Sequence, residues 1–325
     1  MSARIVVTTH LPGDPVAQLR AHPVGRDAEI VYLDESRQPD RQELLEAVRG
    51  ADALLPHIPD RIDAEVMDAA GSGLRVISNY GVGYDNIDVE AARARDVIVT
   101  NTPDVLTEAT ADIAWLLLMN AARGTLHADR ELRSGDWAGW HPTQFVGKDL
   151  VDRTLLVVGM GRIGRAVARR ALGWRMRILY TARTPKPEAE AEPMGAIRVE
   201  LEEGLARADV VSVHCPLNEE TRHLLDARRL ALMKPGAILV NTARGAVVDE
   251  AALAEALENG RIHAAGLDVY EREPEVHPGI LGQERAVLLP HIGSATEDTR
   301  EGMTGIAVRN LLAGLSGEAP PNQVA

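Results

Sequence analysis

The chain has 325 residues, of which 45% are hydrophobic and only 3% aromatic, and it carries a formal net charge of −13. This length exceeds what one hydrophobic core usually serves, so two domains are expected. The acidic excess disfavours nucleic acid and anionic membrane surfaces as partners, and the few aromatic residues leave little to stack on bases. No apolar run approaches the roughly 20 residues of a membrane span.

The start of the chain and its cysteine content predict a soluble, cytoplasmic protein. A strand-like run, Arg4–Thr9, begins almost at once, without a signal-peptide pattern. Cys215 is the single cysteine, so no intrachain disulfide can form and a reducing compartment fits.

Strand-like runs alternate with helix-like segments, which predicts α/β architecture with parallel sheets. The expected strands are Arg4–Thr9, Ala28–Leu33, Asp52–Leu55, Leu74–Asn79 and Val97–Asn101, then Leu155–Val158, Arg177–Thr181, Asp209–His214, Ala237–Asn241, His263–Val269 and Ala286–Leu289. Two sheets of five or six strands are more plausible than one sheet of eleven.

The chain is expected to cross between its two domains twice. A proline turn at Thr102-Pro103 precedes an apolar stretch, Val105–Ala122, that predicts a buried helix. A second junction near Pro290 leaves a helix over Glu297–Leu315, which we expect to return to the N-terminal domain. The predicted domains are therefore 1–102 plus 291–325 and 103–290, with the active site in a cleft between them. The Pro/Glu/Ala-rich segment Thr184–Glu192 predicts a solvated surface loop.

The most specific motif is a strand, Leu155–Val158, that runs into Gly159-x-Gly161-x-x-Gly164. In a dinucleotide site the first glycine allows the tight turn, the second lets the backbone approach a pyrophosphate, and the third lets the helix pack on the sheet. The following helix, expected over Arg162–Leu172, would direct the N–H groups of its first turn, with Arg162 and Ile163, at the phosphates.

The end of the next strand bears on which dinucleotide binds. NAD selection usually places an acid there, but no acid precedes Glu188. Arg183 could instead pair with the 2′-phosphate of NADP(H), and Thr184 could add a hydroxyl donor. NADP(H) is therefore the expected cofactor; use of NAD(H) and a plain surface role for Arg183 remain open.

Three later strands of this half are each followed by a reactive side chain: Arg244, Glu273 and His291. The carboxyl ends of parallel strands line the ligand crevice, so the three should lie together. A histidine can protonate a developing alkoxide, a carboxylate can orient that histidine, and an arginine can bind a substrate carboxylate. The set predicts reduction of a 2-oxoacid.

These motifs, in the form Asn241-Thr-Ala-Arg-Gly245, Gly266-Leu-Asp-Val-Tyr270 with Glu273-Pro274, and Pro290-His-Ile-Gly-Ser294, resemble the D-isomer-specific 2-hydroxyacid dehydrogenase family. Within it, Trp137–Pro142 and Arg177–Thr184 are most similar to glyoxylate/hydroxypyruvate reductases. The resemblance implies two Rossmann-like or flavodoxin-like domains, catalytic roles for Arg244, Glu273 and His291, and a nicotinamide contact at Asp268. It further implies cofactor contacts at His214, Pro216, Thr242, Ala243 and Gly293.

The resemblance also implies substrate contacts outside the trio. Backbone N–H groups of Val82 and Gly83 would bind the substrate carboxylate, and Val82 stands where phosphite-oxidising relatives carry a lysine. Trp140 matches a tryptophan that reaches towards the partner's substrate in a dimer, and the apolar Val105–Ala122 helix also suggests a homodimer. His57, where an apolar residue is usual, is either a contact for a polar substrate tail or a rim histidine. No metal is expected.

The predicted activity is NAD(P)H-dependent reduction of glyoxylate or hydroxypyruvate to the D-2-hydroxyacid, with His291 as proton donor. Two alternatives stay open: a reductase of a bulkier 2-oxoacid, including a short phosphoglycerate dehydrogenase, and a dinucleotide-sensing corepressor or scaffold.

Overall fold

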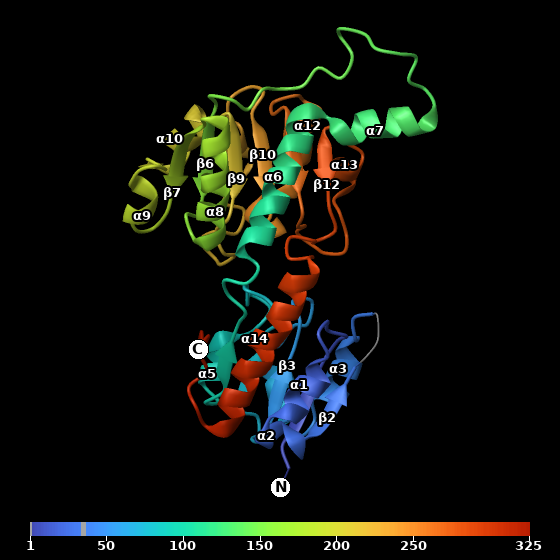
Figure 1. Cartoon of the computed structure of the whole chain (residues 1–325), viewed down its shortest axis with the longest axis vertical. Helices are drawn as coiled ribbons and strands as arrows, with labels where there is room; N and C mark the ends of the chain where they lie inside the picture. Colours follow the sequence, from blue (N-terminus) through green and yellow to red (C-terminus); the bar gives the residue numbers. More distant parts are fainter. Residues whose placement is uncertain (1, 34–36) are drawn as a thin grey trace. The chain divides into compact units, whose positions relative to one another are not determined.

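The computed structural model describes residues 2–33 and 37–325 and divides them into two compact units (Figure 1). One unit joins the chain up to Leu106 with Ser294–Ala325, and the other is Thr107–Gly293. The expected junctions, after residues 102 and 290, lie a few residues earlier in each case, so that His291 falls in the second unit.

The first unit is built on a five-stranded parallel sheet of order β2-β1-β3-β4-β5. This is the flavodoxin-like order, in which the second strand lies outside the first. Its strands are β1 (Arg4–Val7), β2 (Glu29–Tyr32), β3 (Ala53–Leu55), β4 (Val76–Ser78) and β5 (Ile98–Thr100); its helices are α1 (Pro15–Ala21), α2 (Pro23–Arg26), α3 (Arg41–Ala47), α4 (Ala64–Ala70), α5 (Val89–Arg93) and α14 (Glu297–Ser316).

The second unit has a seven-stranded parallel sheet of order β12-β11-β10-β9-β6-β7-β8, the Rossmann order with one strand added. Its strands are β6 (Thr154–Val158), β7 (Arg177–Thr181), β8 (Ile197–Arg198), β9 (Val210–Val213), β10 (Ile238–Asn241), β11 (Ala264–Leu267) and β12 (Ala286–Leu288). Its helices are α6 (Thr107–Arg123), α7 (Thr125–Ser134), α8 (Arg162–Ala171), α9 (Pro187–Glu190), α10 (Leu201–Arg207), α11 (Ala227–Leu230), α12 (Glu250–Glu258) and α13 (Pro278–Leu281), with short 3₁₀ turns at Leu172–Trp174 and Gly245–Val247.

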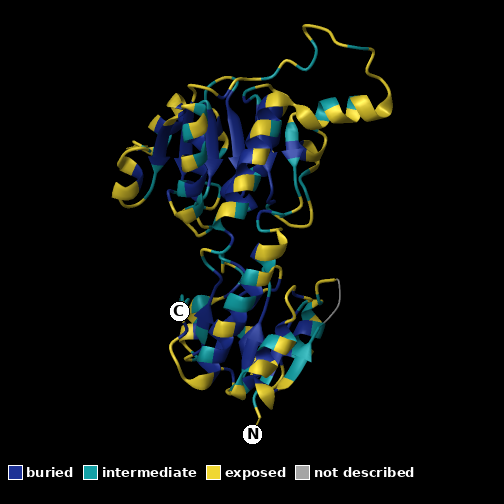
Figure 2. Ribbon diagram, in the orientation of Figure 1, coloured by how far each residue is buried: buried dark blue, intermediate teal, exposed yellow. Residues whose placement is uncertain are grey.

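The central strands of this second sheet are apolar because helices cover both of their faces (Figure 2). On one face α6 packs beside α8, where Trp115 stacks on Trp174 with ring centroids 4.6 Å apart and donates to the carbonyl of Val167. A Cβ at Gly266 would lie 2.8 Å from the Cβ of Leu117, so glycine there lets α6 approach β11. That glycine therefore serves packing.

The last helix, α14, belongs to the first unit. Ser78 of β4 donates to the carbonyl of Ala307 on α14 over 2.8 Å. A Cβ at Gly314 would lie 2.8 Å from the Cβ of Val76, so α14 lies directly on this sheet.

Three expectations need correction. Among the described residues the second sheet has seven strands where six were expected. The additional strand, β8, is exposed and only two residues long, so the sequence shows no alternation there that would predict it. The expected loop at Thr184–Glu192 contains α9, which buries Ala189. The helix predicted as buried is α6, but Leu116 and Met119 on it are exposed.

An exposed arm follows α6. Helix α7 and the irregular segment 135–146 after it, which together form this arm, are mostly exposed, and α7 buries none of its residues (Figure 2). The arm carries Trp137 and Trp140, the latter 82% exposed. Across residues 2–33 and 37–325, no helix combines the length and the apolar character that crossing a bilayer requires.

Candidate active site

The glycine turn after β6 has the geometry that a dinucleotide requires. Gly159 has a φ of 98°, and a Cβ there would lie 2.6 Å from the backbone nitrogen of Cys215. A Cβ at Gly164 would lie 2.3 Å from the carbonyl oxygen of Gly159, so only glycine lets α8 come this close. A Cβ at Gly161 would meet nothing within 4 Å, and no side chain caps the first turn of α8. Gly159 and Gly164 thus shape the turn, and Gly161 leaves space beside the helix N-terminus.

The neighbouring strand ends also offer polar groups to such a ligand. Thr242, after β10, is buried, and within the described part of the chain its hydroxyl has no hydrogen-bond partner. His214 and Pro216 follow β9; the imidazole Nε2 of His214 lies 2.7 Å from the hydroxyl of Ser212, and burial lowers the pKa of His214 to about 3. His214 is therefore neutral at physiological pH. The residues present fit a dinucleotide.

The end of β7 carries more positive charge than the sequence indicated. Arg183 and Thr184 are both exposed. Arg198, on β8, donates to the carbonyl oxygens of Ala182 (2.9 Å) and Arg183 (3.2 Å), which places a second guanidinium beside this turn. Glu188, the first acid after the strand, is bound to Arg165 of α8 at 2.6 Å. Arg198 had no sequence signal, because β8 is too short to recognise.

The loop that carries Arg244 is fixed from both sides by Asn241, the last residue of β10. The Asn241 side chain accepts from the amide of Ala243 (3.0 Å) and donates to the carbonyl of Arg244 (2.8 Å). A Cβ at Gly245 would lie 1.9 Å from the carbonyl carbon of Tyr270, so this loop packs directly on the backbone that leads to Glu273. Asn241 and Gly245 stand in the predicted motif, but their positioning function needed the structure.

Glu273 and His291 are joined by a hydrogen bond. Nδ1 of His291 lies 2.7 Å from Oε2 of Glu273, whose Oε1 accepts from the amide of Tyr270 at 3.0 Å. Burial alone would raise the pKa of Glu273. The hydrogen bond and charge of His291, the Tyr270 amide and the charge of Arg244 outweigh burial, so the pKa of Glu273 is lowered and the carboxylate is ionised at neutral pH.

Asp268 is buried, and its backbone carbonyl accepts from the amide of His291 at 2.9 Å. Its carboxylate oxygens accept from the amides of Ile292 and Gly293, each over 2.7 Å. A Cβ at Gly293 would lie 3.1 Å from one of these oxygens, so a larger residue would crowd the contact. Burial raises the pKa of Asp268 against the opposing effect of these amides and of His291.

In the first unit, the loop after β4 turns its carbonyl groups inward. The carbonyls of Gly81, Val82 and Gly83 accept from the amide of Thr102 (3.0 Å), the side chain of Asn101 (2.8 Å) and the side chain of Asn79 (2.7 Å), respectively. In a trans peptide the N–H group points opposite to the preceding carbonyl. The N–H groups of Val82, Gly83 and Tyr84 therefore point away from these interior partners, the arrangement that an anion-binding loop needs.

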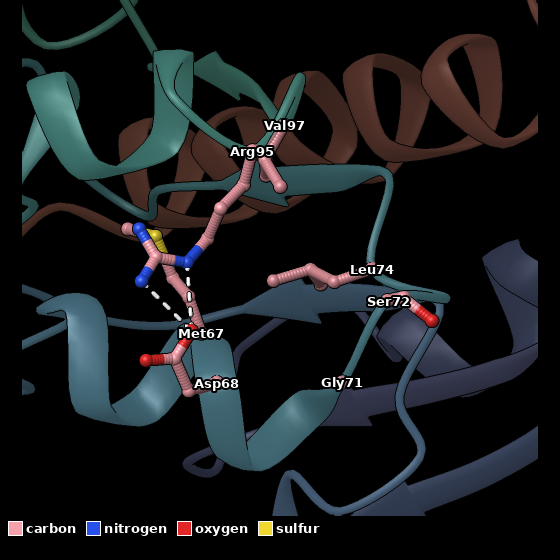
Figure 3. Close-up of a pocket in the computed structure, with 7 residues that line it drawn as sticks. All are labelled: Met67, Asp68, Gly71, Ser72, Leu74, Arg95 and Val97. Atoms are coloured by element: carbon pink, nitrogen blue, oxygen red, sulfur yellow. Dashed lines mark hydrogen bonds and ion pairs between the residues drawn. The ribbon is translucent and has the colours of Figure 1, made fainter.

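A separate cavity of about 330 Å³ lies elsewhere on the first unit (Figure 3). Leu74 and Val97, which precede β4 and β5, line it, so it lies at the amino ends of the strands. The loop 79–84 after β4, called the Val82 loop below, lies at their carboxyl ends. Arg95 pairs with Asp68 across it at 2.8 Å. It takes no part in the site.

Comparisons with known proteins agree with this geometry. Residues 115–293 match the model for the NAD-binding domain of D-isomer specific 2-hydroxyacid dehydrogenases. The chain belongs to the D-isomer specific 2-hydroxyacid dehydrogenase family. It is therefore an NAD(P)-dependent dehydrogenase, as the sequence predicts.

Relatives of this family align over the whole chain. A protein named glyoxylate reductase from Thermococcus onnurineus is 49% identical over 328 residues, covering 100% of this chain and 96% of the relative. A crystal structure of a protein from Thermus thermophilus is 50% identical, has a TM-score of 0.90 and covers 99% of this chain and 100% of its own. An NADPH-dependent glyoxylate/hydroxypyruvate reductase from Sinorhizobium meliloti, in complex with NADP and malonate, is 34% identical with a TM-score of 0.85, covering 100% and 97%. The predicted two-sheet α/β fold is confirmed.

Proposed function

We propose that this dehydrogenase reduces glyoxylate to glycolate and hydroxypyruvate to D-glycerate, with NADPH as the preferred reductant. The observation that carries the proposal is the 2.7 Å hydrogen bond between His291 and Glu273, on a loop packed against that of Arg244. The names of the relatives, glyoxylate reductase above all, support the substrate class. The second unit would bind the dinucleotide through Gly159, Gly161, Arg162, Ile163, Gly164, His214, Pro216, Thr242, Ala243, Asp268 and Gly293.

In the proposed reaction each residue has a separate task. The reduced nicotinamide, when bound, supplies a hydride to the carbonyl carbon. The N–H groups of Val82 and Gly83 bind the substrate carboxylate, and the guanidinium of Arg244 binds the carboxylate or carbonyl oxygen and stabilises its developing negative charge. His291, oriented through Nδ1 by Glu273, donates a proton from Nε2 to that oxygen, and the Glu273 carboxylate stabilises the imidazolium beforehand.

Initial rates of NADPH and NADH oxidation with glyoxylate, hydroxypyruvate and pyruvate test this function. We expect turnover of the first two and a lower KM for NADPH. His291→Asn is the sharpest variant, because His291 has a φ of 55°, which asparagine tolerates, and the amide can still bind Glu273. It should fold and lose about 10³-fold in kcat. Near-normal turnover by this variant would contradict the assignment of His291, and no turnover by the wild type would favour a bulkier 2-oxoacid or a sensor.

We propose the NADP preference on the charge around the end of β7. Arg183 and Thr184 would bind the 2′-phosphate, and Arg198 adds a second guanidinium held to the backbone of the same turn. Glu188, the first acid after β7 and thus a candidate acceptor for ribose hydroxyls, is instead paired with Arg165.

We also propose a cytoplasmic homodimer. Exposed apolar side chains concentrate on α6 and on the arm formed by α7 and residues 135–146: Leu116, Met119, Leu126, Leu132, Trp137, Trp140 and Val146. Such a concentration is typical of an interface, and Trp140 would then lie near the partner's substrate. Sedimentation velocity at micromolar concentration should give a dimer, and a monomer would contradict the proposal. A single cysteine fits the reducing cytoplasm, which cell fractionation would test.

A further inference from the structure

A histidine–aspartate pair adjoins the Val82 loop. His57 follows β3 at the carboxyl edge of the first sheet, and its backbone pairs with Tyr80 in a parallel bridge. The amide of Tyr80 donates to the carbonyl of Pro56 at 2.8 Å. A Cβ at Gly81 would lie 2.9 Å from a side-chain carbon of Ile58. The segment that carries His57 is thus packed against the start of the loop proposed to bind the substrate carboxylate.

The carboxylate of Asp60 fixes the orientation of the His57 ring. Oδ2 of Asp60 lies 2.8 Å from Nδ1 of His57 and accepts from the His57 amide at 3.2 Å and from the hydroxyl of Thr8. Asp60 is only 1% exposed, and its other oxygen has no hydrogen-bond partner within the described residues. A buried carboxylate that is only partly satisfied costs stability. Packing alone would not favour this pair, which indicates a task for the histidine.

The bond to Asp60 determines what the rest of the ring can do. With Nδ1–H donated to the carboxylate, Nε2 is an acceptor when the imidazole is neutral and a donor when it is protonated. Nε2 has no partner in the part of the chain that the structure describes, and the side chain is 18% exposed. A hydroxyl both donates and accepts, so it matches Nε2 in either state, whereas a carboxylate or phosphate matches only the protonated ring.

We propose that His57, positioned by Asp60, determines specificity by binding the C3 hydroxyl of a 3-hydroxy-2-oxoacid whose C1 carboxylate lies on the Val82 loop. This inference rests on the proposed function and narrows its substrate class to hydroxypyruvate-like acids. Glyoxylate has no C3, and pyruvate differs from hydroxypyruvate by this hydroxyl alone. The His57 contribution is therefore measurable as the ratio of kcat/KM for hydroxypyruvate to that for pyruvate.

The experiment compares the wild type with His57→Asn. The asparagine amide can replace Nδ1–H towards Asp60 and leaves nothing in the place of Nε2, so the buried carboxylate keeps its partner. His223→Asn is the matched control, because His223 is also a partly exposed histidine bound to a carboxylate, Glu271, at 2.6 Å, and its φ of 48° suits asparagine.

We expect His57→Asn to lower the hydroxypyruvate-to-pyruvate ratio about tenfold, as the loss of one hydrogen bond predicts, with glyoxylate kcat/KM unchanged within about twofold. His223→Asn should leave all three values unchanged. A ratio that stays within about twofold of the wild type in His57→Asn would overturn the role of His57 while leaving the proposed function intact.

If the wild type reduces none of these acids, the proposed function fails and binding decides the role of His57. Calorimetric titration with D-glycerate and D-lactate, in the presence of NADP, then compares two ligands that differ by the same hydroxyl. Tighter binding of D-glycerate by the wild type, lost in His57→Asn, would support the inference. Equal binding, or binding of neither, would overturn it.

Discussion

Asp268 holds the backbone that begins at His291 through three consecutive amides. Its carbonyl accepts from the amide of His291 (2.9 Å), and its carboxylate accepts from the next two, Ile292 and Gly293. His291 has a φ of 55°, a region that non-glycine residues seldom occupy, so its conformation costs energy that surrounding contacts must offset. The left-handed conformation of His291 thus depends on an aspartate 23 residues earlier in the chain.

Asp268→Asn is the test of that dependence. An asparagine can present one oxygen to these amides but must direct its NH₂ group at the other, so one charge-assisted hydrogen bond is replaced by a clash of donors. We expect a loss of about 2 kcal/mol in the free energy of unfolding and at least a tenfold loss in kcat. Urea unfolding and steady-state rates measure the two effects. A stable, fully active variant would show that the conformation of His291 does not depend on the carboxylate of Asp268.

Glu273→Gln tests the charge beside His291 separately from its geometry. Glutamine can still accept from the Tyr270 amide and donate its NH₂ group to Nδ1 of a neutral His291, but it provides no negative charge to stabilise an imidazolium. We expect about a tenfold lower kcat/KM near pH 7 with stability unchanged. Because the pKa of Glu273 is lowered from 4.5, the carboxylate is ionised at neutral pH and loses its charge in the folded enzyme only as the pH falls through that lowered value. The advantage of the wild type over Glu273→Gln should therefore shrink on acidification, and a constant ratio would contradict this reading.

The sequence indicated the candidate residues at the strand ends more readily than the groups that position them. Arg244, Glu273 and His291 lie within six residues after the ends of β10, β11 and β12, and strand ends can be located from apolar runs, so a common edge of the parallel sheet could be expected for them. His291 and Glu273 follow the neighbouring strands β12 and β11, so the strand order alone brings the two hydrogen-bonded residues near each other.

The groups that hold these residues could not be read in the same way. Asn241 acts across two residues of its own loop, and Asn101 binds a carbonyl 19 positions away, which no local pattern encodes. Arg198 was missed because a two-residue exposed strand has neither periodicity nor an apolar core face. Side-chain-to-backbone contacts depend on the register of distant segments, and register is set by packing.

Arg183→Ala tests the proposed cofactor preference. Loss of a guanidinium from the 2′-phosphate should raise KM for NADPH about tenfold and leave KM for NADH unchanged. Arg198→Ala should give the same effect in weaker form, because Arg198 is bound to the carbonyls of Ala182 and Arg183. Arg93→Ala, an exposed arginine of the first unit paired with Glu90, is the control. Equal effects on both dinucleotides would indicate a structural role for Arg183.

Gly159→Ala and Gly161→Ala should separate folding from cofactor binding within one motif. Alanine at 159 would have to adopt a φ of 98°, which is unfavourable for it, and its Cβ would lie 2.6 Å from the backbone nitrogen of Cys215. We therefore expect the free energy of unfolding to fall by about 1–3 kcal/mol. Alanine at 161 meets no protein atom within 4 Å, so stability should be unchanged while KM for NADPH rises at least tenfold. Urea denaturation and initial rates distinguish them. Normal NADPH affinity in Gly161→Ala would place the pyrophosphate elsewhere.

His214 predicts a specific acid sensitivity of the folded state. Burial lowers its pKa from 6.5 to about 3, so below pH 6.5 the unfolded chain takes up a proton that the folded chain refuses. The free energy of unfolding must then fall by at most about 1.4 kcal/mol per pH unit until the pH nears 3, and above pH 6.5 His214 has no effect. His214→Gln keeps a polar atom for Ser212 but does not titrate. Between pH 7 and pH 5 the wild type should lose about 2 kcal/mol more than His214→Gln in urea unfolding. Carboxylates titrate alike in both proteins, so parallel losses would mean that His214 is protonated in the folded protein.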